Sequence, residues 1–171
     1  MTLLNAETGQ VPISDSTLRT SELDLNSVTA EWYLGLYPPE RMPMLAVWAL
    51  EQGFDGPALR ELAGCSTATH SDERGLIERA LRELGKEPLD LSSAGRLLAI
   101  LLCKQIVSGQ TSPYEGASRI WSVYGRCGRP KSLIPFVGFA SEWEDDLDHR
   151  DRYDKLIAEA AREFLKNAPT L

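Results

Sequence analysis

The sequence contains one strongly acidic segment. Residues 142–154 hold seven Asp or Glu residues and two arginines, a local charge of −5. Asp148 and Asp151 fit the start of a helix, where the dipole favours negative charge, whereas Glu144 fits a helix end, where it does not. The pattern suits a solvated turn between two helices, or a docking surface for a basic partner with Trp143 as an edge anchor. The residues expected to contact the partner are Glu142, Trp143, Glu144, Asp145, Asp146 and Asp148.

A small metal-dependent enzyme is an alternative use of the same carboxylates, because Mg²⁺ and Ca²⁺ prefer oxygen ligands. The segment lacks the ligand spacing and the turn glycine of an EF-hand. Cys65 and His70 are five positions apart, but no nearby thiol or imidazole completes the four ligands of zinc. We therefore expect no metal, no other cofactor and no enzymatic activity.

A second charged segment is basic. Residues 96–131 contain six Lys or Arg residues and one acid, a local charge of +5. Arg126, Arg129 and Lys131 lie in a loop with two glycines, so a helical regulator that binds nucleic acid is a further alternative. Residues 54–85 also have a helix-turn-helix-like pattern, but the acids on the second helix disfavour contact with phosphates. The whole chain carries a charge of −7, which makes a nucleic-acid partner a poor expectation.

Helical periodicity dominates the elements that must position these residues. Apolar side chains recur at helical spacing from residue 26 onward, and alternation typical of a strand is short wherever it occurs. We expect an all-α fold: a single compact bundle of seven to eight helices over residues 26–171. Residues 1–25 are expected to form an extended or partly disordered arm. Because the segments 43–53 and 93–108 are apolar on every side, they should lie at the centre of the bundle.

Several helix starts have specific signals. Ser112-Pro113-Tyr114-Glu115 is a capping box with proline at the first helical position. Asp90 or Ser92 should cap the helix predicted over residues 93–108. Asn26 or Ser27 should cap the first helix of the chain.

The chain has the features of a cytoplasmic protein. Its three cysteines are too few, and odd in number, for a disulfide framework, which favours a reducing compartment. The first residues lack the basic and apolar regions of a secretory signal. The longest apolar runs have seven residues, well short of the roughly 20 that span a membrane. Cys103, inside one of these runs, is expected to be buried and unreactive.

Three segments are similar to parts of small helical bacterial proteins of the immunity or antitoxin type. They are Ser112–Ala117, Ile120-Trp121 and Phe136–Asp145, and the similarity extends over about a third of the chain. Proteins of this type are partners of polymorphic toxins, so the resemblance implies an inhibitor that binds a cognate toxin in the cytoplasm. It transfers no functional residue, and Gly116 and Trp121 are equally explained by close helix packing and core filling.

The charge pattern agrees with this implication. An acidic surface suits a basic, nuclease-like toxin, because it speeds association and competes with the phosphate groups of the substrate. The expected function is therefore protein–protein interaction, most concretely the neutralisation of a toxin through the acidic segment.

Overall fold

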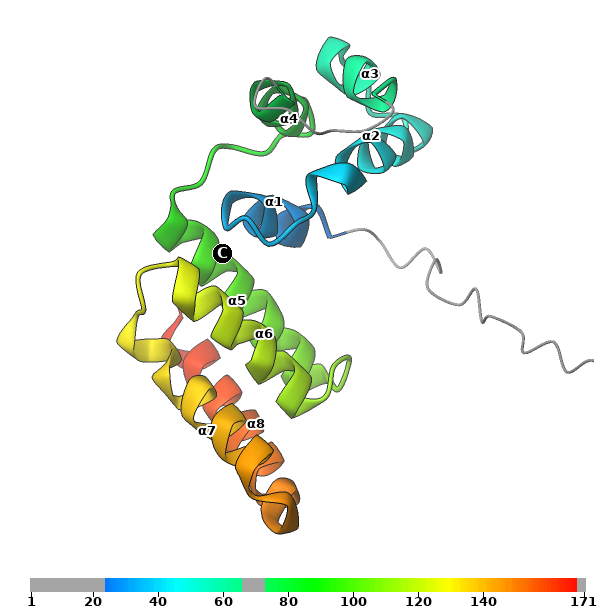
Figure 1. The fold of residues 1–171 in the computed structure, drawn as a ribbon. Coiled ribbons are helices and arrows are strands. Elements are labelled where there is room, and N and C mark those ends of the chain that lie inside the picture. The colour runs from blue at the N-terminus through cyan, green and yellow to red at the C-terminus, as the bar shows by residue number, and fades with distance from the viewer. Residues whose placement is uncertain (1–23, 66–72, 169–171) are drawn as a thin grey trace, which may run out of the picture.

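Every regular element in the described part of the chain is a helix. The computed structural model describes residues 24–65 and 73–168 (Figure 1). In these ranges the helices are α1 (Leu25–Tyr33), η1 (Pro39–Arg41), α2 (Met42–Glu51), α3 (Pro57–Ala63), α4 (Glu73–Glu83), α5 (Leu91–Ser108), α6 (Pro113–Arg126), η2 (Lys131–Leu133), α7 (Ile134–Asp145), η3 (Leu147–His149) and α8 (Arg150–Asn167), where η marks a 3₁₀ turn. The predicted all-α fold is confirmed. An arm was expected over residues 1–25, and residues 1–23 of it lie outside the described residues.

The local signals place the helix starts correctly in most cases. Residues 112–115 form the predicted capping box at the start of α6. Asp90 caps α5 by accepting the N–H three residues further on at 2.8 Å, and these hydrogen bonds lower the pKa of its carboxyl group. The first helix begins earlier than expected, because Asp24 provides the cap and not Asn26 or Ser27. Aspartate is as good an N-cap as asparagine or serine, so the helix can begin at Leu25 without losing capping free energy.

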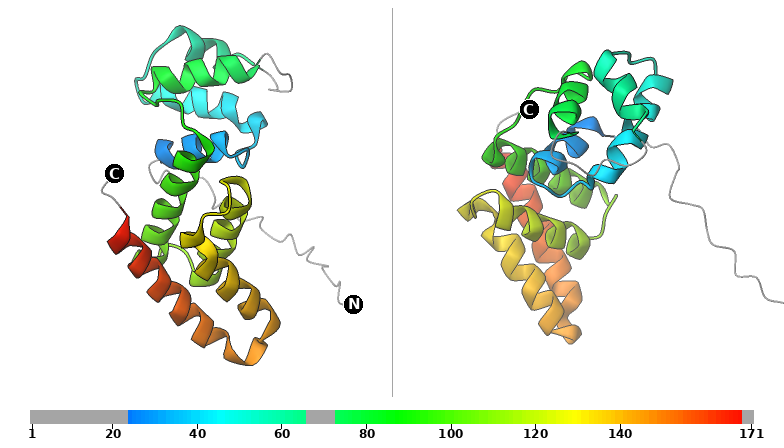
Figure 2. Two further views of the ribbon diagram at one scale, coloured as in Figure 1. Left: turned by 90° about the vertical axis from the view of Figure 1, so that its left-hand side faces the viewer. Right: turned by 45° about the horizontal axis from the view of Figure 1, so that its top comes forward.

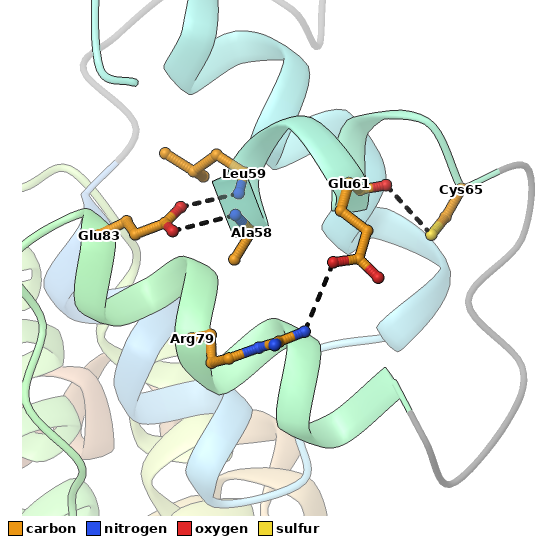
Figure 3. A network of polar contacts seen from close by, with 6 residues as sticks. All are labelled: Ala58, Leu59, Glu61, Cys65, Arg79 and Glu83. Carbon is orange, nitrogen blue, oxygen red and sulfur yellow. Dashed lines mark hydrogen bonds and ion pairs between the residues drawn. The ribbon is translucent and has the colours of Figure 1, made fainter. Parts of the chain in front are cut away.

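The start of α3 is capped from another helix. Gly56 precedes α3 and has no side chain, so the first N–H groups need a partner from elsewhere. Glu83, at the end of α4, accepts the backbone N–H of Ala58 at 3.0 Å and that of Leu59 at 2.8 Å (Figure 3). A Cβ on Gly56 would lie 2.1 Å from Oε2 of Glu83, so glycine leaves the space that this contact requires.

The buried side chains form two clusters that meet at α1. Figures 1 and 2 show α1–α4 on one side of the molecule and α5–α8 on the other. Within α1, Val28 belongs to the first cluster, whereas Ala30 and Leu34 belong to the second. The N-terminal cluster comprises Val28, Met42, Leu45, Ala46, Ala49, Ala58, Leu59, Leu62, Leu76, Ile77, Ala80, Leu81 and Leu84. The bundle cluster comprises Ala30, Leu34, Ala94, Leu98, Ala99, Leu102, Cys103, Ile106, Ala117, Ile120, Val123, Cys127, Leu133, Phe136, Ala140, Ile157 and Ala161.

Helices α5–α8 form an up-and-down bundle. Each packs against the next, and α8 returns to α5. Short connections make successive helices antiparallel. One end of the bundle therefore gathers the start of α5, the α6–α7 connection and the end of α8. The opposite end carries the α5–α6 and α7–α8 connections.

Only one of the two apolar segments is central. Helix α5 contacts α1, α6 and α8, as expected for a central helix, although Leu91 and Val107 near its ends are 53% and 42% exposed. It alone among the described residues is long and apolar enough to cross a membrane, with a mean hydropathy of 1.3, and its packing in the bundle accounts for that composition. Helix α2 was expected to be buried on all sides, which is wrong: Met44 is 72% exposed and Val47 37% exposed. Its inner face packs in the N-terminal cluster, whereas Met44 is largely exposed and Val47 partly exposed.

Candidate protein-binding surface

The acidic residues predicted as a site lie together at one end of the bundle. There α7 passes through η3 into α8, at the orange end of the ribbon in Figure 1. We call residues 142–151 the acidic tip. Its exposed acids are Glu142, Glu144, Asp145, Asp148 and Asp151, and Asp146 is half-buried. The structure thus brings all six predicted site residues to the end of α7 and the turn that follows it.

Trp143 holds the acidic tip to the bundle. The ring of Tyr114 stacks on its indole with centroids 3.8 Å apart and planes 12° apart. The guanidinium carbon of Arg150 lies over the same ring, 3.8 Å from its centroid. Each group lies 3.8 Å from the ring centroid, and two groups at that distance cannot occupy the same face. Tyr114 and Arg150 therefore cover opposite faces of the indole. Trp143 was expected to be an anchor for a partner, but its faces are already occupied by its own chain.

Glu144 is also tied to α6. The hydroxyl of Tyr114 donates to Oε1 of Glu144 at 2.6 Å, a length typical of a bond to a charged acceptor. This bond is the main cause that raises the pKa of Tyr114, because ionisation would remove the donor and place two negative charges together. The start of α6 therefore fixes the position of the last turn of α7.

Asp146 is paired within the tip. Nδ1 of His149 lies 2.9 Å from both carboxylate oxygens, and the hydroxyl of Tyr153 donates to Oδ2 at 3.4 Å. The contact with His149 is the leading reason that the pKa of Asp146 lies below its usual value. Asp146 thus contributes to holding η3 in place more than to a free charged surface.

The remaining acids flank an exposed leucine in the sequence. Glu142, Asp145 and Asp148 have no cationic group within 4 Å among the described residues. Leu147, between them, is 66% exposed. Leu147 was absent from the predicted site, although a single leucine inside a run of acids can be recognised in the sequence as a candidate contact residue. An exposed apolar side chain with charged neighbours is a feature of protein interfaces, which combine an apolar centre with a polar rim.

The basic loop lies at the opposite end of the bundle. Arg126, Arg129 and Lys131 are all exposed, near the α6–α7 connection. Gly128 and Arg129 both have positive φ angles, 85° and 56°, which produce a tight turn. The α7–α8 turn is therefore acidic, and the α6–α7 connection at the other end of the bundle is basic.

The helix-turn-helix-like pattern is accounted for by packing. Helices α3 and α4 contact each other, and the exposed face of α4 carries ion pairs. Arg74 pairs with Glu78 at 3.0 Å, and Arg79 reaches Glu61 of α3 at 3.5 Å. These arginines are already matched by carboxylates, so this face does not gain the surplus positive charge that a DNA-reading helix needs.

The cysteines and histidines in the described ranges take part in no metal-binding group. Cys103 is fully buried, as predicted, and burial raises the pKa of its thiol to about 12. Cys65 is half-exposed, and the predicted neighbour His70 lies outside the described residues. Residues 24–65 and 73–168 contain no group of three or more His, Cys, Asp or Glu side chains placed to hold a metal ion. The alternative of a metal-dependent enzyme therefore gains no support from the acidic tip.

Comparison with known proteins gives no relative: no family model, curated protein or solved structure matches the chain. The resemblance to immunity proteins therefore stays an expectation. Of the residues that carry it, Gly116 is explained by packing, because a Cβ there would lie 2.4 Å from Cγ1 of Ile106. Trp121 was assigned to core filling, which is wrong, since its side chain is 38% exposed.

Proposed function

We propose that this chain is a protein-binding module that docks its acidic tip onto a basic surface of a partner protein. The most concrete partner is a bacterial toxin, which the chain would neutralise as an immunity protein. The observation that carries the proposal is that the exposed Leu147 lies in the same turn as the exposed Glu142, Asp145 and Asp148, whose carboxylates have no ion pair among the described residues. A basic partner would pair these charges while burying the leucine.

The charges of the tip are costly to the isolated chain. Glu144 and Asp145 lie in the last turn of α7, where the helix dipole disfavours negative charge by about 0.3–1 kcal/mol per residue. Mutual repulsion between neighbouring carboxylates adds to this cost. A cationic partner removes both penalties on binding, which makes the tip more suited to recognition than to stability.

The tip is held in place before a partner arrives. Trp143 is clamped between Tyr114 and Arg150, and Asp146 is bonded to His149. A surface that is already ordered loses little conformational entropy on binding, which favours tight association. On a nuclease-like toxin, its carboxylates would occupy the cationic groups that otherwise bind phosphate.

A charge-reversal experiment tests the proposal. The partner is first captured from the native cell with the wild-type chain and purified, and its association rate is measured at low and high salt. The triple variant Glu142→Lys, Asp145→Lys and Asp148→Lys should associate at least about tenfold more slowly at low salt, and this difference should shrink at high salt. A second variant, Leu147→Asp, should dissociate faster, because it places a charge in the desolvated centre.

The matched control carries the same change of net charge elsewhere. Glu51, Glu87 and Glu159 are exposed and have no ion pair among the described residues, so their triple change to lysine should leave the association rate near that of the wild type. If the two triple variants slow association equally, the tip has no specific role and the proposal fails. Inhibition of the captured partner's toxicity by the wild type, and not by the tip variant, would support neutralisation in particular.

A further inference from the structure

A cavity lies at the end of the bundle opposite the acidic tip. It has a volume of about 290 Å³ and is lined by the start of α5, the α6–α7 connection and the end of α8. Small-molecule sites have volumes of roughly 300–1,000 Å³, so this cavity fits a ligand of small size. It does not involve any residue of the acidic tip, and it stands independently of the proposed toxin binding.

The floor of the cavity is apolar. Leu133 and Cys127 are buried in the bundle cluster, and Phe164 lies beside them. Phe164 meets the buried ring of Phe136 edge to face, with centroids 6.1 Å apart, which fixes its orientation. The floor therefore presents a rigid surface suited to an aromatic or aliphatic group.

The backbone is shaped to keep this floor in place. Cys127 packs directly against Gly95 of α5, where a Cβ would lie 2.3 Å from the Cβ of the cysteine. The next two residues, Gly128 and Arg129, take left-handed φ angles that turn the chain toward Pro130, another lining residue. For arginine this conformation costs about 1–2 kcal/mol, so the surrounding packing must hold the loop.

The rim of the cavity offers hydrogen-bond donors and one positive charge. Ser92 and Arg96 come from the first two turns of α5, Ser132 from η2 and Asn167 from the end of α8. Among the residues that the structure describes, no acidic side chain lines the cavity. In the described part of the chain, no carboxylate lies within 4 Å of the Arg96 guanidinium, so its donors are free for a ligand.

We propose that this cavity binds a small organic carboxylate with an apolar body. Arg96 pairs with the carboxylate in the bidentate manner that its planar group allows, and the hydroxyls of Ser92 and Ser132 donate to it. The apolar body rests on Leu133 and Phe164. A single arginine matches the single charge of a carboxylate better than the charge of a phosphate. The exposed Arg126, Arg129 and Lys131 near the entrance raise the local concentration of anions.

Titration of the full ¹⁵N-labelled chain followed by NMR tests this site. 4-Phenylbutyrate and octanoate are the probes, and 4-phenylbutyramide is the neutral match. At least one carboxylate should cause saturable shifts at the backbone amides of Ser92, Ser132 and Asn167. For about 12 non-hydrogen atoms we expect a Kd of about 1 mM or tighter. The neutral amide should bind at least about tenfold more weakly, because it lacks the charge that pairs with Arg96.

Two variants and a control separate the cavity from weak binding elsewhere. Arg96→Gln should raise the Kd about tenfold or more without changing the melting temperature, since the guanidinium has no ion-pair partner among the described residues. Ser132→Phe should fill the cavity and abolish the shifts. Arg41→Gln, which removes an exposed arginine of η1, should leave binding unchanged.

The inference is overturned by any of four results. The first is that neither carboxylate gives saturable shifts, and the second is that the shifts map to residues away from the cavity. The third is that Arg96→Gln binds the carboxylates as tightly as the wild type. The fourth is that phenyl phosphate binds more tightly than the carboxylates.

Discussion

The guanidinium of Arg150 covers one face of the Trp143 indole, and its Nε donates to the backbone carbonyl oxygen of Trp143 at 3.2 Å. Arg150 is the first residue of α8, and Trp143 lies in the last turns of α7. One side chain therefore closes the turn through a cation–π contact and a hydrogen bond to the end of the preceding helix. Since this turn carries the acidic tip, the geometry of the tip depends on the contact between Trp143 and Arg150.

We expect the Trp143–Arg150 contact to be measurable as a coupling free energy. Trp143→Leu, Arg150→Ala and the double variant should give an interaction of about 1 kcal/mol in urea denaturation, as cation–π pairs do when partly desolvated. The control is Arg152→Ala, because Arg152 is an exposed arginine two residues further along α8. Additive effects for Trp143 and Arg150 would show that the stacked geometry contributes nothing to stability.

The cap that Glu83 provides to α3 predicts a second coupling. Glu83→Gln should cost about 1.5–3 kcal/mol of unfolding free energy, because two N–H groups lose a charged acceptor. Gly56→Ala should cost a similar amount for a different reason: the new methyl group takes the place of the Glu83 carboxylate. The φ of Gly56 is −177°, which alanine adopts without strain.

These two changes remove the same contact, so their effects should not add. The double variant is expected to be only slightly less stable than the worse single variant, measured by urea denaturation. A double variant that loses the full sum would mean that Gly56 and Glu83 act independently, against the structure.

Two helical glycines should respond to alanine in opposite directions. At Gly95 a Cβ would lie 2.3 Å from the Cβ of Cys127, so Gly95→Ala forces α5 and α6 apart and should cost about 1–3 kcal/mol. At Gly138, in α7, nothing lies within 4 Å of the added Cβ. Gly138→Ala should therefore raise stability by about 0.5–1 kcal/mol through helix propensity. Thermal denaturation of both variants checks the pair, and a loss of stability in each would contradict the stated packing.

Local chemistry made the helix positions predictable. The capping box at residues 112–115, the aspartate cap at Asp90 and the proline at the first turn of α2 each depend on residues next to one another in the chain. The acidic tip was predictable for the same reason, since its charges are contiguous in sequence. Such signals need no knowledge of what packs where.

Contacts between distant residues were not predictable. Met44 and Leu45 are adjacent and similarly apolar, yet one is exposed and the other buried, because only the arrangement of neighbouring helices decides which face of α2 is covered. The clamp on Trp143 joins Tyr114, 29 positions earlier, to the first residue of α8. The division of the core into two clusters is likewise a property of helix packing and not of composition.

The two clusters predict that the N-terminal part of the fold opens separately from the bundle. The α1–α5 contact is the extensive one between α1–α4 and α5–α8, and Arg119 of α6 adds an ion pair with Glu31 of α1 at 2.8 Å. Leu59, in the N-terminal cluster, is 1% exposed, and Leu59→Ala should cost about 2–5 kcal/mol. Because that loss falls on α2–α4, native-state hydrogen exchange should accelerate in these helices while α5–α8 keep the protection of the wild type.

The matched change in the other cluster should behave differently. Leu98 is 2% exposed in α5, and Leu98→Ala weakens the bundle on which α1 rests. Exchange should then accelerate in α1 and α5–α8, and in α2–α4 as well, since these helices are joined to the bundle through α1. If Leu59→Ala instead accelerates exchange equally in all helices, the chain unfolds as one cooperative unit. The boundary at α1 would then mark a division of contacts without a division of stability.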